Sequence, residues 1–136
     1  QPSAYDRIQA EEYKLIRDIA SKESCVIVGR AADYILSDQS HVSIFLFAPM
    51  EDRVKRKMAL LKPEDAAKMT PAAMEKVIKQ MDKQRKRYYE YYTDMKWGAR
   101  DSYDLLINPS QSGIDGAVKI IRTYIDECRG ESIMPN

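Results

Sequence analysis

Apolar residues occur along the chain either in continuous runs or at helical spacing, and the two patterns alternate. Continuous runs at 25–29 and 42–48 predict two strands, because strands buried on both faces of a parallel sheet lack polar alternation. A third run at 103–108 predicts another strand, which ends at Pro109. Strands separated by helical segments indicate an α/β fold with a parallel sheet.

Capping signals and apolar stripes predict the helices around these strands. The segments 3–6 and 112–115 each have the spacing of a capping box. Thr70 followed by Pro71 predicts the start of a helix of about six turns. The last helix carries apolar residues at helical spacing: Ile114, Val118, Ile121 and Ile125.

Gly29 and Arg30 follow the first predicted strand, at the edge where ligands bind in open parallel sheets. A glycine lets a ligand approach the backbone, and a guanidinium binds a phosphate through two parallel hydrogen bonds. Arg30 is therefore a candidate phosphate ligand. The alternative is that Arg30 extends into solvent or pairs with Asp33 on the next turn.

Arg85 interrupts the apolar stripe of the long helix. The stripe contains Met74, Ile78, Met81, Arg85, Tyr88 and Tyr92. A cation on a buried face needs an anionic partner, and either Asp82 or a bound phosphate would provide one. Arg53 and Arg56 share one face of the preceding helix, which by itself is an ordinary charged surface.

Composition narrows the classes of function. The 136 residues carry a net charge of +1 and 44% hydrophobic residues, which predicts a single domain over 1–136 with one modest core. The stretch RKRYYEYYTDMKW mixes basic and aromatic residues, as some nucleic-acid-binding segments do. Half of the tyrosines fall at core spacing, however, and we expect no nucleic-acid partner.

The sequence gives no support for metal or membrane binding. His41 is the only histidine, and Cys25 and Cys128 lack the spacing of metal ligands, so no metal site is predicted. No apolar run approaches the roughly 18 residues of a membrane span. With no disulfide framework and no membrane partner, a cytoplasmic protein is expected.

Four segments, taken in order, resemble the cytidylate kinase-like family, a branch of the P-loop nucleoside monophosphate kinases. They are CVIVGRAADYIL, VSIFLFAPMEDRVKRKM, IKQMDKQRKRYYEYYT and KWGARDSYDLLINPSQSGIDGAV, and the resemblance runs from about residue 5 to 126. It implies a P-loop NTPase-like, three-layer α/β/α parallel sheet with a helical lid at about 62–72. The implied reaction transfers the γ-phosphoryl group of ATP, with Mg²⁺, to CMP or a related nucleotide.

The resemblance also implies residues that bind the acceptor nucleotide. Gly29 and Arg30 match a strand-end Gly-Arg-Asp of the family, whereas Asp33 comes two positions later than the family's aspartate. Asp82 matches an acidic residue at the exit of the lid and would orient Arg85 or touch the acceptor. The identity of the base is therefore left open by the sequence.

Three arginines match the family's lid residues, and one asparagine matches its ATP side. Arg53 and Arg56 lie at the entrance of the lid and Arg85 at its exit, where they would neutralise charge on the transferring phosphoryl group. Asn108 ends the third predicted strand, where this fold packs near the base of ATP. These roles are implied by the resemblance.

One part of the family pattern is absent from the 136 residues. The five glycines, at 29, 98, 113, 116 and 130, form no GxxxxGK[ST] loop, so the cradle for the ATP phosphates is missing. In this fold the strand before that loop lies centrally, between the strands matching 25–29 and 42–48. We expect an N-terminally truncated kinase carrying the acceptor and lid portion. The alternatives are a homodimer that exchanges elements and a non-catalytic nucleotide-binding or interaction domain.

Overall fold

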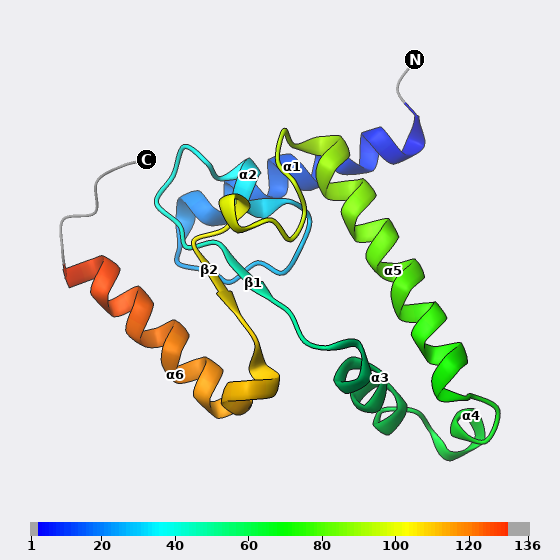
Figure 1. Cartoon of the computed structure of the whole chain (residues 1–136). Helices are drawn as coiled ribbons and strands as arrows, with labels where there is room; N and C mark the ends of the chain where they lie inside the picture. Colours follow the sequence, from blue (N-terminus) through cyan, green and yellow to red (C-terminus); the bar gives the residue numbers. More distant parts are fainter. Residues whose placement is uncertain (1–2, 131–136) are drawn as a thin grey trace.

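A computed structural model describes residues 3–130 and shows a mixed α/β chain that is mostly helical, with a small parallel sheet (Figure 1). In chain order the elements are α1 (Ala4–Lys22), α2 (Ala32–Ile35), β1 (Ile44–Leu46), α3 (Met50–Ala59), α4 (Pro63–Ala66), α5 (Pro71–Tyr92), the 3₁₀ turn η1 (Arg100–Ser102), β2 (Leu105–Ile107) and α6 (Pro109–Gly130). None of the helices in this part of the chain is both long and apolar enough to cross a membrane.

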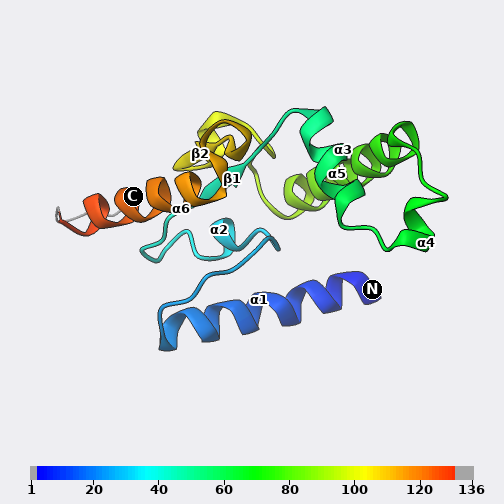
Figure 2. The same ribbon diagram turned by 90° about the horizontal axis from the view of Figure 1, so that it is seen from below.

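The sheet consists of β1 and β2, which run parallel. Phe45 pairs with Leu106, with one further residue pair on each side. The strands predicted at 42–48 and 103–108 are confirmed in a shorter form. In Figure 2, α2 lies between α1 and the strands, while α3 and α5 extend away from the sheet together.

The strand predicted at 25–29 is not formed. Residues 24–28 are extended, yet no described strand pairs with them. Ile27 packs on the cluster between α1 and α2, but Val26 and Val28 are 93% and 89% exposed. The prediction was wrong because an apolar extended segment becomes a strand only when a neighbouring backbone pairs with it.

Two separate apolar clusters hold the helices. Ile16 of α1 packs on α2 and its flank, and the cluster consists of Ile16, Ala32, Ile35 and Leu36. The second joins α3 to α5 through Val54, Met74 and Ile78, with Met50, Met58, Leu61 and Met69 around it. Packing along α3 therefore fixes the N-terminal half of α5.

The predicted helix starts are confirmed for α1 and α5 but not for α6. Ser3 and Asp6 form the capping box of α1, and the Thr70 hydroxyl accepts a hydrogen bond from the N–H of Ala73 at 3.1 Å. Helix α6 begins at Pro109 and is interrupted at Gly113, where φ is 74°. Its expected capping box does not form, since the Ser112 hydroxyl donates to the carbonyl of Gly113 at 2.9 Å.

Candidate functional site

Asp82 of α5 joins two of the predicted arginines. Its carboxylate accepts two hydrogen bonds from Arg53 of α3, at 2.7 and 2.8 Å, and one from Arg85 at 3.0 Å. The Arg53 and Asp82 side chains are 30% and 21% exposed, whereas Arg85 is 47% exposed. Of the two partners considered for Arg85, the structure contains Asp82, and about half of the Arg85 side chain remains exposed.

The electrostatics of this triad follow from the paired geometry. The hydrogen bonds from Arg53 lower the pKa of Asp82 the most, and Arg85 lowers it further, against the opposing effect of burial. The same bonds raise the pKa of Arg53. Asp82 is therefore an anion that holds two cations in fixed positions, on two different helices, at neutral pH.

A hollow of about 120 Å³ lies between α3 and α5 next to the triad. Its lining residues are Arg53, Arg56, Lys57, Leu60, Ile78, Met81 and Arg85. Four of these seven side chains are cationic, and Asp82 supplies one opposing charge. A small hollow with several converging cations and an apolar floor suits an anion such as a phosphate group.

Arg30 lies close to the same helix. Its guanidinium carbon is 5.5 Å from the centre of the Tyr88 ring, and Tyr88 is three residues from Arg85 on α5. Residues three apart are neighbours on a helix surface, so Arg30 is placed about one helical turn along from Arg85. Its suggested pairing with Asp33 is not observed in the structure.

The backbone around Arg30 is strained. Gly29, Arg30 and Ala31 have φ values of 76°, 59° and 54° in succession. Glycine adopts such angles readily, but arginine and alanine rarely do, at a cost of about 1–3 kcal/mol each. Strain of this kind is concentrated at ligand-binding positions.

Asp33 has partners other than the arginines. One of its oxygens accepts hydrogen bonds from the hydroxyls of Tyr89 at 2.9 Å and Ser43 at 3.0 Å, and the other accepts from the N–H of Tyr34 at 2.8 Å. Burial, followed by the bond to Asp33, raises the pKa of Tyr89 well above its ordinary value. Asp33 thus joins α2 to α5 and to the residue before β1.

Asn108 directly follows β2, at the same edge of the parallel sheet as the segment that leads from β1 into α3. Its side-chain oxygen accepts a hydrogen bond from the N–H of Ser110 at 3.0 Å and so caps the first turn of α6. The Ser110 hydroxyl is buried and has no hydrogen-bond partner among the described residues. Arg53, Arg56, Asp82 and Arg85 are thus gathered together. Arg30 contacts Tyr88 farther along α5, and the side chain of Asn108 is bonded to the start of α6.

Sequence reasoning missed two contributors to this region. Lys57 lines the hollow, and its position four residues after Arg53 was the available signal. Tyr88 was interpreted only as a member of the apolar stripe of the long helix, and the Arg30 guanidinium lies over its ring. Within residues 3–130, acidic, histidine and cysteine side chains form no group of three suited to holding a metal ion.

Comparison with known proteins gives one family. The sequence model of the cytidylate kinase-like family matches residues 1–111. The chain is 28% identical over 120 residues to a cytidylate kinase of Staphylothermus marinus, covering 88% of this chain and 64% of that protein. It is 29% identical over 112 residues to a cytidylate kinase of Desulfurococcus amylolyticus, covering 82% and 57%. The chain thus spans about three fifths of the length of these curated relatives.

A solved structure has a similar fold. It is the crystal structure of an uncharacterized protein from Eubacterium ventriosum, 33% identical, with a TM-score of 0.76, and the similarity covers 90% of this chain and 74% of that one. The family match extends from α1 to α5 and over both strands of the sheet. On this match, the chain belongs to the cytidylate kinase-like family.

Proposed function

We propose that this chain is the acceptor-nucleotide and lid part of a nucleoside monophosphate kinase of the cytidylate kinase type. The complete enzyme would transfer the γ-phosphoryl group of ATP to CMP or a related nucleotide. The observation that carries the proposal is the hollow between α3 and α5, where Arg53, Arg56, Lys57 and Arg85 converge. Phosphoryl transfer depends mainly on positioning and charge neutralisation, which such a cluster supplies.

Each cation has a role set by its exposure and partners. Both terminal nitrogens of Arg53 donate to the carboxylate of Asp82, so Arg53 is held in place and would fix the position of the phosphoryl group. Arg85 and Arg56 are more exposed and would turn toward the charge that develops during transfer. A positioned arginine contributes about 10³–10⁵ in rate in comparable reactions. Arg30 would bind the acceptor phosphate beside Gly29, where the strained backbone supports a ligand contact.

The proposed fold of the complete enzyme includes one more strand, between residues 24–28 and β1, followed by the loop that binds the ATP phosphates. Support comes from the exposed, unpaired face of Val26 and Val28. The apolar residues Ile8 and Leu15 of α1 are also exposed and line a hollow of about 470 Å³. Parallel sheets are normally covered on both faces, and these surfaces are not.

The remaining assignments follow from the same proposal. Residues 62–72, which contain α4, would be the mobile part of the lid. Asn108 would lie near the base of ATP, whereas Asp33 contributes by holding α5 in place. The complete enzyme would use Mg²⁺ together with ATP, as the family does in general, although residues 3–130 contain no group of three acidic, histidine or cysteine side chains suited to a metal ion. The partner would be a small nucleotide in the cytoplasm, with a homodimer as one way to cover the exposed sheet edge.

The first test is the intact mass of the natural gene product, followed by its ATP-dependent phosphorylation of CMP, UMP and AMP. We expect a heavier protein that is active. Arg85→Ala should then lower kcat by at least about tenfold with little change in melting temperature. Arg87→Ala is the matched control, because Arg87 is exposed on the same helix and does not line the hollow.

Two other results would contradict the proposal. Near-normal turnover of Arg85→Ala together with a large loss of melting temperature would make Arg85 a structural residue. A natural product of 15.7 kDa that binds CMP without turnover would instead indicate a non-catalytic nucleotide-binding domain.

A further inference from the structure

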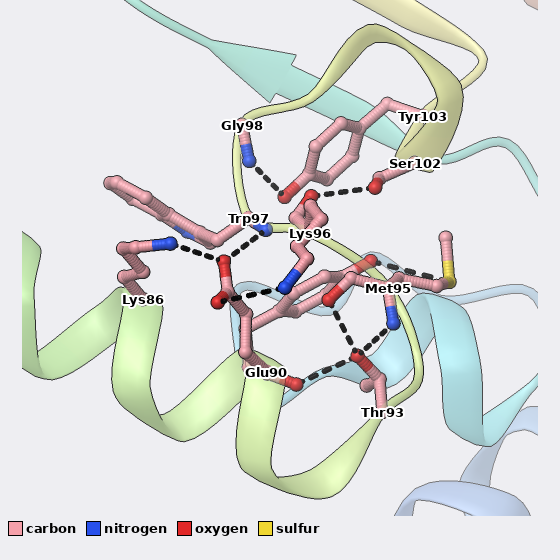
Figure 3. Close-up of polar contacts among 10 residues, drawn as sticks. Lys86, Glu90, Thr93, Met95, Lys96, Trp97, Gly98, Ser102 and Tyr103 are labelled. Atoms are coloured by element: carbon pink, nitrogen blue, oxygen red, sulfur yellow. Dashed lines mark hydrogen bonds and ion pairs between the residues drawn. The ribbon is translucent and has the colours of Figure 1, made fainter.

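The C-terminal end of α5 is bonded to the loop from 93 to 103 by polar contacts (Figure 3), and ring contacts join that loop to β1. Tyr89 stacks on Tyr103 with ring centres 6.0 Å apart, and Tyr103 meets Phe45 of β1 at 4.8 Å. A second connection runs through Glu90 and Trp97. The second connection includes a hydrogen bond to a carboxylate, and charge-assisted bonds of this kind fix geometry more strictly than the stacking of Tyr89 on Tyr103.

Glu90 is the centre of that second connection. One oxygen of its carboxylate accepts hydrogen bonds from the side chain of Lys86 at 2.7 Å and from the backbone N–H of Trp97 at 3.1 Å. The ammonium of Lys96 is 3.9 Å from the other oxygen. The Glu90 side chain is only 21% exposed, so these bonds are partly shielded from water. In Figure 3 the carboxylate lies between α5 and the loop that follows it.

The loop from 93 to 103 is itself well ordered by hydrogen bonds. The Thr93 hydroxyl donates to the carbonyl of Tyr89 at 2.7 Å and accepts from the N–H of Met95 at 3.1 Å. The Ser102 hydroxyl donates to the carbonyl of Lys96 at 2.6 Å. The bond between Glu90 and Trp97 therefore attaches α5 to a fixed loop rather than to a freely moving one.

Trp97 continues the connection to the strand. Its ring meets Phe45 edge to face at 5.3 Å. Gly98 follows with a φ of 77°, and a Cβ there would approach the Phe45 ring at 3.4 Å. Since β1 leads into α3 after only residues 47–49, the strand that anchors α5 also sets where α3 begins.

We propose that Glu90 is a positioning residue for the basic hollow. By accepting a hydrogen bond from the N–H of Trp97 it fixes the orientation of α5 relative to β1. It thereby sets the position of Arg85 on α5 relative to Arg53 and Arg56 on α3. Its importance for catalysis rests on the proposed function. The attachment of α5 to the sheet does not, and it has its own readout.

Trp97 provides that readout, because it is the only tryptophan in the chain. Glu90→Gln keeps the side-chain length and removes the charge. Its single amide oxygen would have to accept from both Lys86 and Trp97, which donate to the same oxygen of Glu90, without the strength of charge-assisted bonds. The matched control is Glu75→Gln, on the same helix and paired with Lys79 at 3.2 Å, with no bond to the loop. Acrylamide quenching of Trp97 fluorescence and the affinity for CMP are measured in the complete protein, with any tryptophan outside residues 1–136 replaced by phenylalanine.

For Glu90→Gln we expect about twofold stronger quenching of Trp97 and at least about fivefold weaker CMP binding, with both values unchanged in Glu75→Gln. Equal quenching in the two variants would overturn the proposed attachment. Stronger quenching with unaltered CMP affinity would show that Glu90 stabilises only the loop, and would overturn its role in positioning the basic hollow. Should Glu90→Gln fail to fold, Glu90→Asp, which keeps the charge but shortens the reach, decides the same comparison.

The two proposals fail in different ways. If the unsubstituted protein binds no CMP, the proposed function is wrong, whereas the difference in quenching between Glu90→Gln and Glu75→Gln still tests the attachment. If CMP binds and both variants behave alike, the proposed function stands and the role of Glu90 is wrong.

Discussion

The pair of helices α3 and α5 and the part of the chain around the sheet use their apolar residues in opposite ways. Between α3 and α5 the apolar side chains are enclosed, and Ile78 is only 2% exposed. Around the sheet, Val26, Val28, Ile114 and Val118 are exposed on the segment 24–28 and on α6. The helix pair has a complete core of its own, and the sheet side has apolar surfaces with no partner among the described residues.

This difference explains where the candidate chemistry is found. Arg53, Asp82 and Arg85 need a fixed spacing between α3 and α5, and the enclosed core next to them provides it. The sheet side contributes Arg30, on a strained turn after an extended segment with no partner strand. The cluster of cations between α3 and α5 is thus held by an enclosed core, whereas the turn that carries Arg30 is not.

The largest expected effect is the loss of the core between α3 and α5. Ile78→Ala should lower the free energy of unfolding by about 2–5 kcal/mol, because it removes buried carbon and leaves a cavity. The control is Val77→Ala on the neighbouring, exposed position of the same helix, with a change below about 0.5 kcal/mol. Urea unfolding measures both. Equal effects would show that the helix pair has no core distinct from its surface.

Removing the carboxylate that joins the two helices should have a smaller effect. Asp82→Asn should cost about 1.5–3 kcal/mol near neutral pH, since it weakens charge-assisted hydrogen bonds to Arg53 and Arg85. The folded pKa of Asp82 is lowered, so its contribution is complete above the unfolded value of about 3.9 and disappears as pH falls through the folded pKa. Urea unfolding at a series of pH values from 7 downward checks this, and a difference between the two proteins that does not shrink as pH falls below about 3.9 would contradict it.

Removing one helix cap in each region compares their stability. Loss of a serine or threonine cap typically costs about 1 kcal/mol of free energy of unfolding. Thr70→Ala should lower the free energy of global unfolding by about that amount, because α5 carries the enclosed core. Ser3→Ala should act locally and speed hydrogen exchange in the first turn of α1, a helix with one buried residue. Mass spectrometry of exchanged peptides separates the two outcomes. A comparable global loss from Ser3→Ala would mean that α1 belongs to the same cooperative unit.

The smallest expected effect lies on the exposed segment. Val26→Thr combined with Val28→Thr should change the stability of this chain by less than about 0.5 kcal/mol, since both side chains are almost fully exposed. In a longer natural form whose additional strand covers them, the same substitutions should cost more than about 1 kcal/mol. Thermal melting of both forms measures this. An equally small change in the longer form would contradict the proposed strand.

Local patterns predicted some contacts correctly and others not. The pairing of Arg85 with Asp82 follows from their spacing on one helix, and it was one of the two alternatives that the sequence offered. The pair of hydrogen bonds from Arg53 to Asp82 joins residues 29 positions apart, and it forms only because α3 packs on α5. Asp33, interpreted as an acceptor-nucleotide ligand, is bonded to Tyr89 on a distant helix, and no local pattern indicates such a partner.

By itself, the sequence determined the helix starts at Ser3 and Thr70, the parallel pairing of the two later strands, and the family. Each of these rests on neighbouring residues or on the order of segments. The tertiary structure alone decided that 24–28 stays unpaired, that Arg30 lies on Tyr88, and that Glu90 binds Trp97. Burial and distant pairing depend on which surfaces meet in space, and a one-dimensional pattern does not specify that.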